Sequence, residues 1–326
     1  MTMVAKILIT RKLPGNAIDN LAQKYEIDLW EEVEKIPHDE IKKRIWDKDA
    51  LICLLSDKID KEIIDSAKNL KIIANYAVGY DNIDVEYATK RGIYVTNTPD
   101  VLTDATAELA WALVLSVARR IREADMFLRS GKFNGWEPDL FLGKEVTGSS
   151  IGVIGTGRIG RSFMKKGMGF DIKWCYYSRS RKPDIEKEFN ATYLSPKDMF
   201  SKCDFVSLHV PLTKDTYHLI GREHFERSSG RVILINTSRG AVVDEKEMIK
   251  ALYNGNLRGA GLDVFEREPY IPEELLKLNN VVLLPHIGSA TQKTREKMAE
   301  MACRNVDIAL SGNIPPNLVN RELGLK

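Results

Sequence analysis

The most informative stretch of this 326-residue chain is VIGTGRIG, residues 153–160. It follows an apolar run and precedes a helical pattern, so Gly155, Gly157 and Gly160 form a G-x-G-x-x-G motif between a predicted strand and a predicted helix. In this context the first glycine permits a tight turn, the second lets a pyrophosphate approach the backbone, and the third lets helix and strand pack closely. The residues that complete the loop and supply helix amides are Thr156, Arg158 and Ile159. We interpret the segment as a dinucleotide-binding loop; an incidental glycine-rich turn is the alternative.

Apolar runs alternate with helical patterns on both sides of this loop. Examples are KILIT (6–10), ALICLL (50–55) and LKIIANYA (70–77) before it, and FVSLHV (205–210), RVILINTS (231–238) and VVLLPHIG (281–288) after it. Near-continuous apolar strands separated by helices are typical of parallel sheets covered on both faces. Because the chain length suggests two domains, the predicted fold is α/β, with two doubly wound parallel-sheet domains.

Two segments between these runs have a different character. Residues from about Thr103 to Gly131 predict one long helix, whose broad apolar stripe would face either the core or another subunit. The following residues, 131–150, are glycine-rich and aperiodic, which indicates a connector.

The composition argues against several classes of protein. Hydrophobic residues make up 44% and charged residues 29% of the chain, and a net charge of +2 does not indicate binding to nucleic acid or to an acidic membrane. The first residues lack the long apolar core of a signal peptide. The four cysteines and five histidines form no metal-binding pattern, and the scattered cysteines favour buried thiols in a reducing compartment. We therefore expect a cytoplasmic protein that holds no metal.

The second strand of the nucleotide unit ends in YYSRSRK, residues 176–182. In NAD-binding proteins an acid near this position holds the ribose 2′-hydroxyl, but this segment contains no acid, and Asp171 lies at the other end of the strand. The segment offers two hydroxyls and two guanidinium groups, on Ser178, Arg179, Ser180 and Arg181. Because arginine binds phosphate as a planar fork, we expect NADP(H) to be favoured and NAD(H) to be used as well. Two solvated arginines on a loop are the alternative.

Three later strands end in residues that are poor choices for structure alone. Arg239 follows RVILINTS, Glu268 ends GLDVFERE, and His286 follows VVLLP. The carboxyl ends of parallel strands share one edge of a sheet, where ligands bind, so the three side chains would converge. Arg239 would bind a substrate carboxylate, His286 would exchange a proton with a carbonyl oxygen, and Glu268 would orient the imidazole and stabilise its charged form. Strand-end salt bridges and a packed turn histidine are the alternatives.

The other histidines are weaker candidates for the proton donor. His209 also ends a strand, but its place early in the second half suits the adenosine side of the site. The histidines expected at the surface are His38, His218 and His224.

Six motifs spread over essentially the whole chain resemble those of the D-isomer-specific 2-hydroxyacid dehydrogenase family. They are NYAVGYDNID (75–84), TPDVLTDATAELA (98–110), GVIGTGRIG (152–160), INTSRGAVVDE (235–245), AGLDVFEREP (260–269) and LLPHIGSAT (283–291). Within the family the chain is most similar to the glyoxylate/hydroxypyruvate reductases. By this resemblance the family's catalytic arginine, glutamate and histidine correspond to Arg239, Glu268 and His286.

The resemblance also implies an architecture. A Rossmann nucleotide domain, residues 100–287, would be inserted into a flavodoxin-like substrate-binding domain formed by residues 1–99 and 288–326. Members of the family are usually homodimers. In some reductases the segment that matches the surroundings of Trp136 reaches toward the partner's active site.

Further contacts follow from the same resemblance. The backbone amides of Val78 and Gly79 would bind the substrate carboxylate together with Arg239, and Leu55 would line the pocket. The remaining cofactor contacts, from the nicotinamide end to the adenosine end, would be Thr106, Thr237, Ser238, Asp263, His286, Gly288, Val210 and Pro211.

Other activities known for related proteins fit this sequence less well. Phosphoglycerate dehydrogenases often carry a C-terminal extension and an acid after the second strand, and formate dehydrogenases have glutamine where Glu268 stands. D-Lactate dehydrogenase is a further alternative, although the cofactor loop argues against it. A nucleotide-sensing corepressor of the same fold would need long flanking tails. The expected activity is therefore NAD(P)H-dependent reduction of glyoxylate and hydroxypyruvate.

Overall fold

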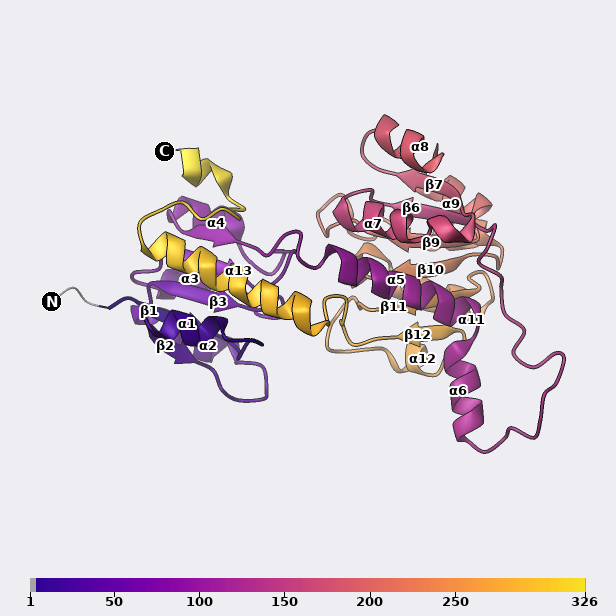
Figure 1. Cartoon of the computed structure of the whole chain (residues 1–326), viewed down its shortest axis with the longest axis horizontal. Helices are drawn as coiled ribbons and strands as arrows, with labels where there is room; N and C mark the ends of the chain where they lie inside the picture. The colour runs from indigo at the N-terminus through magenta and orange to yellow at the C-terminus, as the bar shows by residue number, and fades with distance from the viewer. Residues whose placement is uncertain (1–3, 326) are drawn as a thin grey trace. The chain divides into compact units, whose positions relative to one another are not determined.

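The computed structural model describes residues 4–325, and Figure 1 labels its helices and strands. The chain forms two compact units. The first unit contains the chain up to Leu102 and again from Ser289 onward, and the second is Thr103–Gly288. The second unit is therefore inserted into the first along the chain.

The first unit is built on a five-stranded parallel sheet with the order β2-β1-β3-β4-β5. This is the flavodoxin-like order of a doubly wound sheet. Its strands are β1 (Lys6–Ile9), β2 (Glu26–Leu29), β3 (Ala50–Cys53), β4 (Ile72–Asn75) and β5 (Tyr94–Thr96). Its helices are α1 (Ala17–Ala22), α2 (His38–Arg44), α3 (Lys61–Ser66), α4 (Val85–Lys90) and α13 (Gln292–Leu310), with short 3-10 helices η1 (Ile45–Asp47) and η4 (Arg321–Leu325).

Local sequence explains why these elements form and where they begin. All residues of β3 and β4 are buried, as expected for central strands covered on both faces. Asp60 caps α3 by accepting hydrogen bonds from two backbone amides of its first turn, and Thr291 caps α13 by accepting one from the Thr294 amide. The long helix α13 packs on β3 and β4 (Figure 1), so the last part of the chain completes the unit that the first part begins.

The second unit contains a seven-stranded parallel sheet with the order β12-β11-β10-β9-β6-β7-β8. Its strands are β6 (Ser150–Ile154), β7 (Lys173–Tyr177), β8 (Thr192–Tyr193), β9 (Phe205–Leu208), β10 (Ile233–Asn236), β11 (Gly259–Leu262) and β12 (Val281–Leu283). Its helices are α5 (Thr103–Ala118), α6 (Ile121–Arg129), α7 (Arg158–Lys166), α8 (Pro183–Phe189), α9 (Pro196–Lys202), α10 (Arg222–Ser228), α11 (Glu245–Tyr253) and α12 (Glu273–Leu276), with 3-10 helices η2 (Met168–Phe170) and η3 (Gly240–Val242). The strand order reverses between β6 and β9, which is the topological switch point where a doubly wound sheet binds its ligand.

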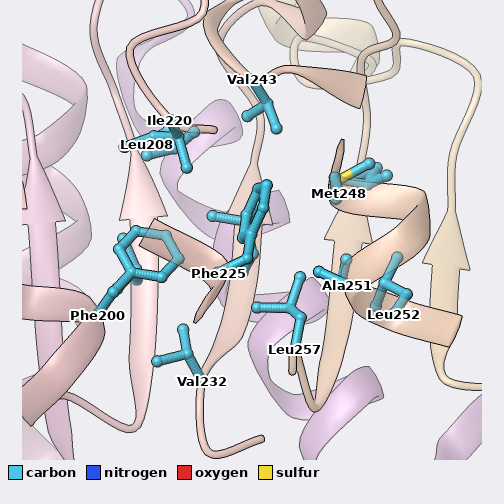
Figure 2. Close-up of a cluster of buried hydrophobic side chains, with 14 of the residues drawn as sticks. Phe200, Leu208, Ile220, Phe225, Val232, Val243, Met248, Ala251, Leu252 and Leu257 are labelled. Atoms are coloured by element: carbon cyan, nitrogen blue, oxygen red, sulfur yellow. The ribbon is translucent and has the colours of Figure 1, made fainter. Parts of the chain in front are cut away.

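Apolar side chains cover both faces of this sheet. Figure 2 shows one cluster, in which the rings of Phe200 and Phe225 lie with their centroids 5.9 Å apart and Met248 comes from α11. On the opposite face Trp111 of α5 stacks on Phe163 of α7, with ring centroids 4.8 Å apart. Because the strands carry apolar residues toward both clusters, they appear in the sequence as continuous apolar runs rather than as an alternating pattern.

The segment predicted as one helix from Thr103 to Gly131 is two helices. The helical pattern breaks at Arg120, whose backbone is left-handed (φ 55°) and whose guanidinium is paired with Glu123 in the next turn. Helix α5 buries much of its apolar surface inside the unit, so it is a core helix. The following residues 130–149 form neither helix nor strand. Among residues 4–325, no helix combines the length and the apolar character needed to cross a membrane.

Candidate nucleotide and acid–base site

The glycine-rich loop connects β6 to α7 at the switch point. Gly155 has a positive φ of 97°, and a Cβ there would lie 2.6 Å from the carbonyl oxygen of His209. A Cβ on Gly160 would overlap the carbonyl oxygen of Gly155. A Cβ on Gly157, in contrast, would meet no described atom within 4 Å. The first and third glycines are therefore required for packing, whereas the second borders open space in front of the helix N-terminus, where a pyrophosphate group fits.

The loop after β7 carries the residues expected to read the 2′ position of the cofactor. The hydroxyl of Ser178 donates a hydrogen bond to the carbonyl oxygen of Ser180, which holds the turn. Arg181 forms a two-pronged ion pair with Glu186 of α8, with N–O distances of 2.9 and 2.8 Å. The sequence segment contains no acid, but the fold brings one to it from the following helix. Arg179 is exposed on the same loop.

Lys182, which the sequence analysis did not select, reaches the glycine-rich loop. Its ammonium group donates a hydrogen bond of 2.9 Å to the carbonyl oxygen of Thr156. The signal was present in the sequence, because Lys182 is the next residue after the two arginines. Only the fold reveals that its side chain crosses from the end of β7 to the loop that follows β6.

Buried polar atoms without a partner among the described residues lie near the ends of β10 and β11. They are Thr237 Oγ1 and Asp263 Oδ2. Thr156 Oγ1, in the glycine-rich loop after β6, is a third buried atom of this kind. The other carboxylate oxygen of Asp263 accepts a 2.7 Å hydrogen bond from the Ile287 amide, and burial raises the pKa of this carboxyl group. Such atoms are costly unless a ligand satisfies them, so they fit a polar group of a bound cofactor.

The segment that carries His286 is held by contacts to α5 and to the residue after β11. Thr106 Oγ1 of α5 donates a 3.2 Å hydrogen bond to the carbonyl oxygen of Gly288. A Cβ on Gly288 would lie 3.2 Å from Asp263 Oδ2, so a larger residue would crowd that carboxylate. These contacts fix the chain on the C-terminal side of His286.

His286 and Glu268 are in direct contact. His286 Nδ1 lies 2.8 Å from Glu268 Oε2, and the other carboxylate oxygen accepts a 2.9 Å hydrogen bond from the Phe265 amide. Burial alone would raise the pKa of Glu268. The hydrogen bond and charge of His286, a backbone amide and the charge of Arg239 together have a larger and opposite effect, so the pKa lies below its usual value. Glu268 is therefore a carboxylate that can orient the imidazole, and Nε2 is the ring nitrogen left for a substrate.

Arg239 begins the turn after β10 and is held close to the Glu268 segment. The side-chain amide of Asn236 donates a 2.9 Å hydrogen bond to the Arg239 carbonyl oxygen. The next residue, Gly240, packs so tightly that a Cβ would overlap the Phe265 carbonyl group. The structure thus brings Arg239, Glu268 and His286 together at one edge of the sheet, as their positions in the sequence predict.

The remaining histidines have other environments. Burial lowers the pKa of His209 to about 3, and its Nε2 lies 2.9 Å from Ser207 Oγ, so this imidazole is neutral and is a poor proton donor. The expectation that His224 lies at the surface is wrong: only 9% of it is exposed, because α10 packs it against the core ring of Phe200. His218 is half-buried, and its Nε2 lies 3.1 Å from Glu266 Oε1.

Other predicted contact residues lie where the strands of each unit end. Val210 and Pro211 follow β9, and the Val210 side chain lies directly over Gly155. The amide and hydroxyl of Ser238 donate hydrogen bonds to the side chain of Asn236. In the first unit, Leu55 follows β3, and Val78 and Gly79 follow β4.

The connector between α6 and β6 exposes large apolar side chains. Trp136 is 84% exposed, and Phe133 and Leu142 are also exposed. In the described part of the chain, no group of three or more histidine, cysteine, aspartate or glutamate side chains is arranged to hold a metal ion.

Comparison with known proteins agrees with this geometry. Residues 111–288 match the family model described as D-isomer specific 2-hydroxyacid dehydrogenase, NAD binding domain. The chain is 54% identical over 325 residues to the glyoxylate reductase of Thermococcus litoralis, covering 98% of each protein.

Solved structures are also similar to this fold. A Thermus thermophilus protein has a TM-score of 0.91 and 43% identity, with 96% of this chain and 99% of that chain covered. The NADPH-dependent glyoxylate/hydroxypyruvate reductase of Sinorhizobium meliloti, in complex with NADP and malonate, has a TM-score of 0.88 and 31% identity, with coverage of 98% and 97%. The chain is therefore an enzyme of the D-isomer specific 2-hydroxyacid dehydrogenase family, with a nicotinamide dinucleotide as its cofactor.

Proposed function

We propose that this enzyme reduces glyoxylate, and also hydroxypyruvate, to the corresponding 2-hydroxy acid with NAD(P)H. The observation that carries the proposal is the 2.8 Å contact between His286 Nδ1 and Glu268 Oε2, with Arg239 beside it at the same sheet edge. It is supported by the name glyoxylate reductase of the T. litoralis relative and by the glyoxylate/hydroxypyruvate reductase activity named for the S. meliloti enzyme.

Each of the three residues has a distinct task in this proposal. The guanidinium of Arg239 binds the substrate carboxylate, which fixes the orientation of the neighbouring carbonyl group. His286 Nε2 donates a proton to the carbonyl oxygen during reduction and accepts it in the reverse reaction. The Glu268 carboxylate holds the imidazole through Nδ1 and stabilises its positive charge, so that the proton is available at Nε2.

The second unit is proposed to bind the dinucleotide, and the first unit to bind the substrate. The bound cofactor supplies the hydride that is added to C2 of the oxo acid. Gly157 and the first amides of α7 hold the pyrophosphate, and Val210 and Pro211 border the adenosine. The unpartnered atoms of Thr237 and Asp263 suit the carboxamide of the nicotinamide ring.

A preference for NADP(H), with NAD(H) also used, remains part of the proposal. It is supported by the cationic loop of Arg179, Arg181 and Lys182 near the 2′ position. The ion pair between Arg181 and Glu186 weakens this support for one of the arginines, because both arms of that guanidinium already bind a carboxylate. Arg179 is therefore the stronger candidate for a phosphate contact.

The proposed substrate pocket includes loops of the first unit. In this proposal the amide groups of Val78 and Gly79 offer hydrogen bonds to the substrate carboxylate, and Leu55, which is 37% exposed, borders the same substrate.

A cytoplasmic homodimer completes the proposal. Exposure of Trp136 and its apolar neighbours supports an additional protein contact at the connector. The four cysteines Cys53, Cys175, Cys203 and Cys303 are all free, which supports a reducing compartment.

Steady-state kinetics with a panel of short 2-oxo acids tests the activity. The expected result is turnover of glyoxylate and hydroxypyruvate with NADPH, and slower turnover with NADH. Pyruvate is included to distinguish a lactate dehydrogenase. Tight NAD(P)H binding with negligible turnover of every oxo acid would identify a nucleotide sensor and contradict the proposal.

A further inference from the structure

The carbonyl groups of Ala77 and Val78, in the loop after β4, are turned toward one neighbouring segment of the first unit. The carbonyl oxygen of Ala77 accepts a 2.8 Å hydrogen bond from the Thr98 amide. The carbonyl oxygen of Val78 accepts a 2.8 Å hydrogen bond from the side-chain amide of Asn97. Two successive peptide groups therefore direct their oxygens to the segment that follows β5.

Planar trans peptide geometry sets the direction of the adjoining N–H groups. In each peptide unit the N–H points opposite to the C=O. The Val78 N–H shares a peptide with the Ala77 carbonyl, and the Gly79 N–H shares one with the Val78 carbonyl. Both N–H groups therefore point away from Asn97 and Thr98, on the same side of the loop. Successive N–H groups arranged in this way suit an anion.

A second asparagine fixes the other end of the loop. Asn75, the last residue of β4, is fully buried and donates a 2.7 Å hydrogen bond to the Gly79 carbonyl oxygen. It also donates a 3.1 Å hydrogen bond to Asn82 Oδ1, and its own Oδ1 accepts bonds from Asn82 Nδ2 and the Cys53 thiol. The Asn75 amide is thus fully engaged in holding backbone and a neighbouring amide.

Asn82 extends this network to the second loop of the pocket. Its Nδ2 donates to the carbonyl oxygens of Leu54 (3.1 Å) and Asp57 (3.0 Å), the residues on either side of the Leu55 loop. The Asp57 carboxylate closes that loop by accepting a 2.8 Å hydrogen bond from the Leu54 amide. The two loops proposed to contact substrate therefore share one hydrogen-bond network.

We propose that Asn97 is a positioning residue for substrate binding, and that Asn75 and Asn82 assist it. By holding the Val78 carbonyl, Asn97 presents the Gly79 amide to the substrate carboxylate. This inference rests on the proposed function, because it assumes that a 2-oxo acid carboxylate binds at Val78 and Gly79. It adds residues that touch neither substrate nor cofactor and act only through the backbone.

The test is the variant Asn97→Ala, which removes the donor without adding a charge. A hydrogen bond to a charged carboxylate accounts for about tenfold to hundredfold in affinity, so KM for glyoxylate should rise by that factor. The carboxylate keeps its charge during hydride transfer, so its binding is the same in ground and transition states, and kcat should stay within about threefold. The inhibition constant of oxalate should rise in parallel with KM, and KM for NADPH should not change.

Asn320→Ala is the matched control. Asn320 is another buried asparagine of the first unit, but its side chain donates to the Ile93 carbonyl oxygen, just before β5, and accepts from the Val95 amide within β5. This control should lower Tm without changing KM for glyoxylate. If Asn97→Ala does not fold, Asn97→Ser, whose side chain is shorter than the asparagine amide, replaces it.

The outcomes separate this inference from the proposed function. Unchanged KM and oxalate inhibition in a folded Asn97 variant, or a loss confined to kcat, would overturn the positioning role. If the unmodified enzyme reduces no 2-oxo acid, the proposed function fails, and calorimetric binding of oxalate to the enzyme and the variant still tests the inference. Equal oxalate affinities in that experiment would then refute it.

Discussion

Substitution of the middle glycine of the loop should separate cofactor binding from folding. In Gly157→Ala the backbone angles (φ −73°, ψ −164°) are extended and suit alanine, and the new methyl group meets no described atom within 4 Å. The only folding cost is the weaker helix-capping tendency of alanine, a few tenths of a kcal/mol relative to glycine and at most about 1 kcal/mol. For a unit of this size that lowers Tm by no more than about 2–4 °C.

The same methyl group should impair binding of the dinucleotide. It occupies the space through which a pyrophosphate approaches the backbone amides of α7. An added methyl in a closely packed contact costs about 1–3 kcal/mol, which corresponds to a rise in the NADPH dissociation constant of about fivefold to 150-fold. The assay is a fluorescence titration of NADPH, combined with thermal unfolding of the enzyme without cofactor.

Two other glycines provide controls for this experiment. In Gly160→Ala the methyl would overlap the Gly155 carbonyl oxygen, so backbone must move, and a cost of about 1–3 kcal/mol should lower Tm by about 2–12 °C. Gly169→Ala, in the 3-10 helix η2, also places its methyl in open space but away from the loop, and should change neither property. Unchanged NADPH affinity in Gly157→Ala, or a stability loss as large as that of Gly160→Ala, would refute the assignment of Gly157 to the pyrophosphate.

Three further predictions concern charged residues. His286→Ala should lower kcat by about 10² or more, as expected for loss of a general acid, whereas Arg239→Ala should mainly raise KM for the oxo acid; steady-state kinetics in which the two variants behave alike would contradict their separate roles. Arg179→Ala should shift the NADPH/NADH ratio of kcat/KM toward NADH more than Arg181→Ala does, because Arg181 is already paired with a carboxylate; an equal or reversed ranking would count against this explanation. Burial raises the pKa of the Glu245 carboxyl group, so the folded protein binds this proton more tightly than the unfolded chain does. The resulting contribution to the free energy of unfolding is present at low pH, and it is lost as the pH rises through the raised pKa. Glu245→Gln should therefore have a higher Tm than the unmodified enzyme at pH 8 and no advantage at pH 4; a difference independent of pH would exclude the carboxyl charge as its cause.

Most of the fold follows from local patterns in the sequence. Apolar runs such as those of β6 and β10 are continuous because both faces of their sheet are covered, and this is visible without coordinates. The helix break was missed because Arg120 is a good helix former, and its left-handed backbone reflects the connection to α6 rather than a local signal. His224 was misplaced for a similar reason: its short helix has charged neighbours, and only packing against Phe200 makes it buried.

The candidate site was predictable to the extent that it depends on strand ends. Residues directly after parallel strands share an edge, so the approach of Arg239 and His286 follows from topology. Contacts made by long side chains across the fold do not follow from it. Glu186 contacts Arg181 because of where the next helix is placed, and Lys182 contacts the glycine-rich loop because its side chain is long. Neither contact can be predicted from the spacing of residues in the sequence.

Two histidine–glutamate pairs lie in the second unit, and geometry explains why only one suits proton transfer. His218 Nε2 lies 3.1 Å from Glu266 Oε1, and its Nδ1 faces Asp244 Oδ2 at 3.8 Å. Both ring nitrogens of His218 are thus directed at carboxylates. His286 directs only Nδ1 to Glu268, so Nε2 can meet a substrate oxygen. A general acid needs one ring nitrogen anchored and the other available to the substrate. His286 has this arrangement, whereas both nitrogens of His218 are taken up by carboxylates, which suits a structural role.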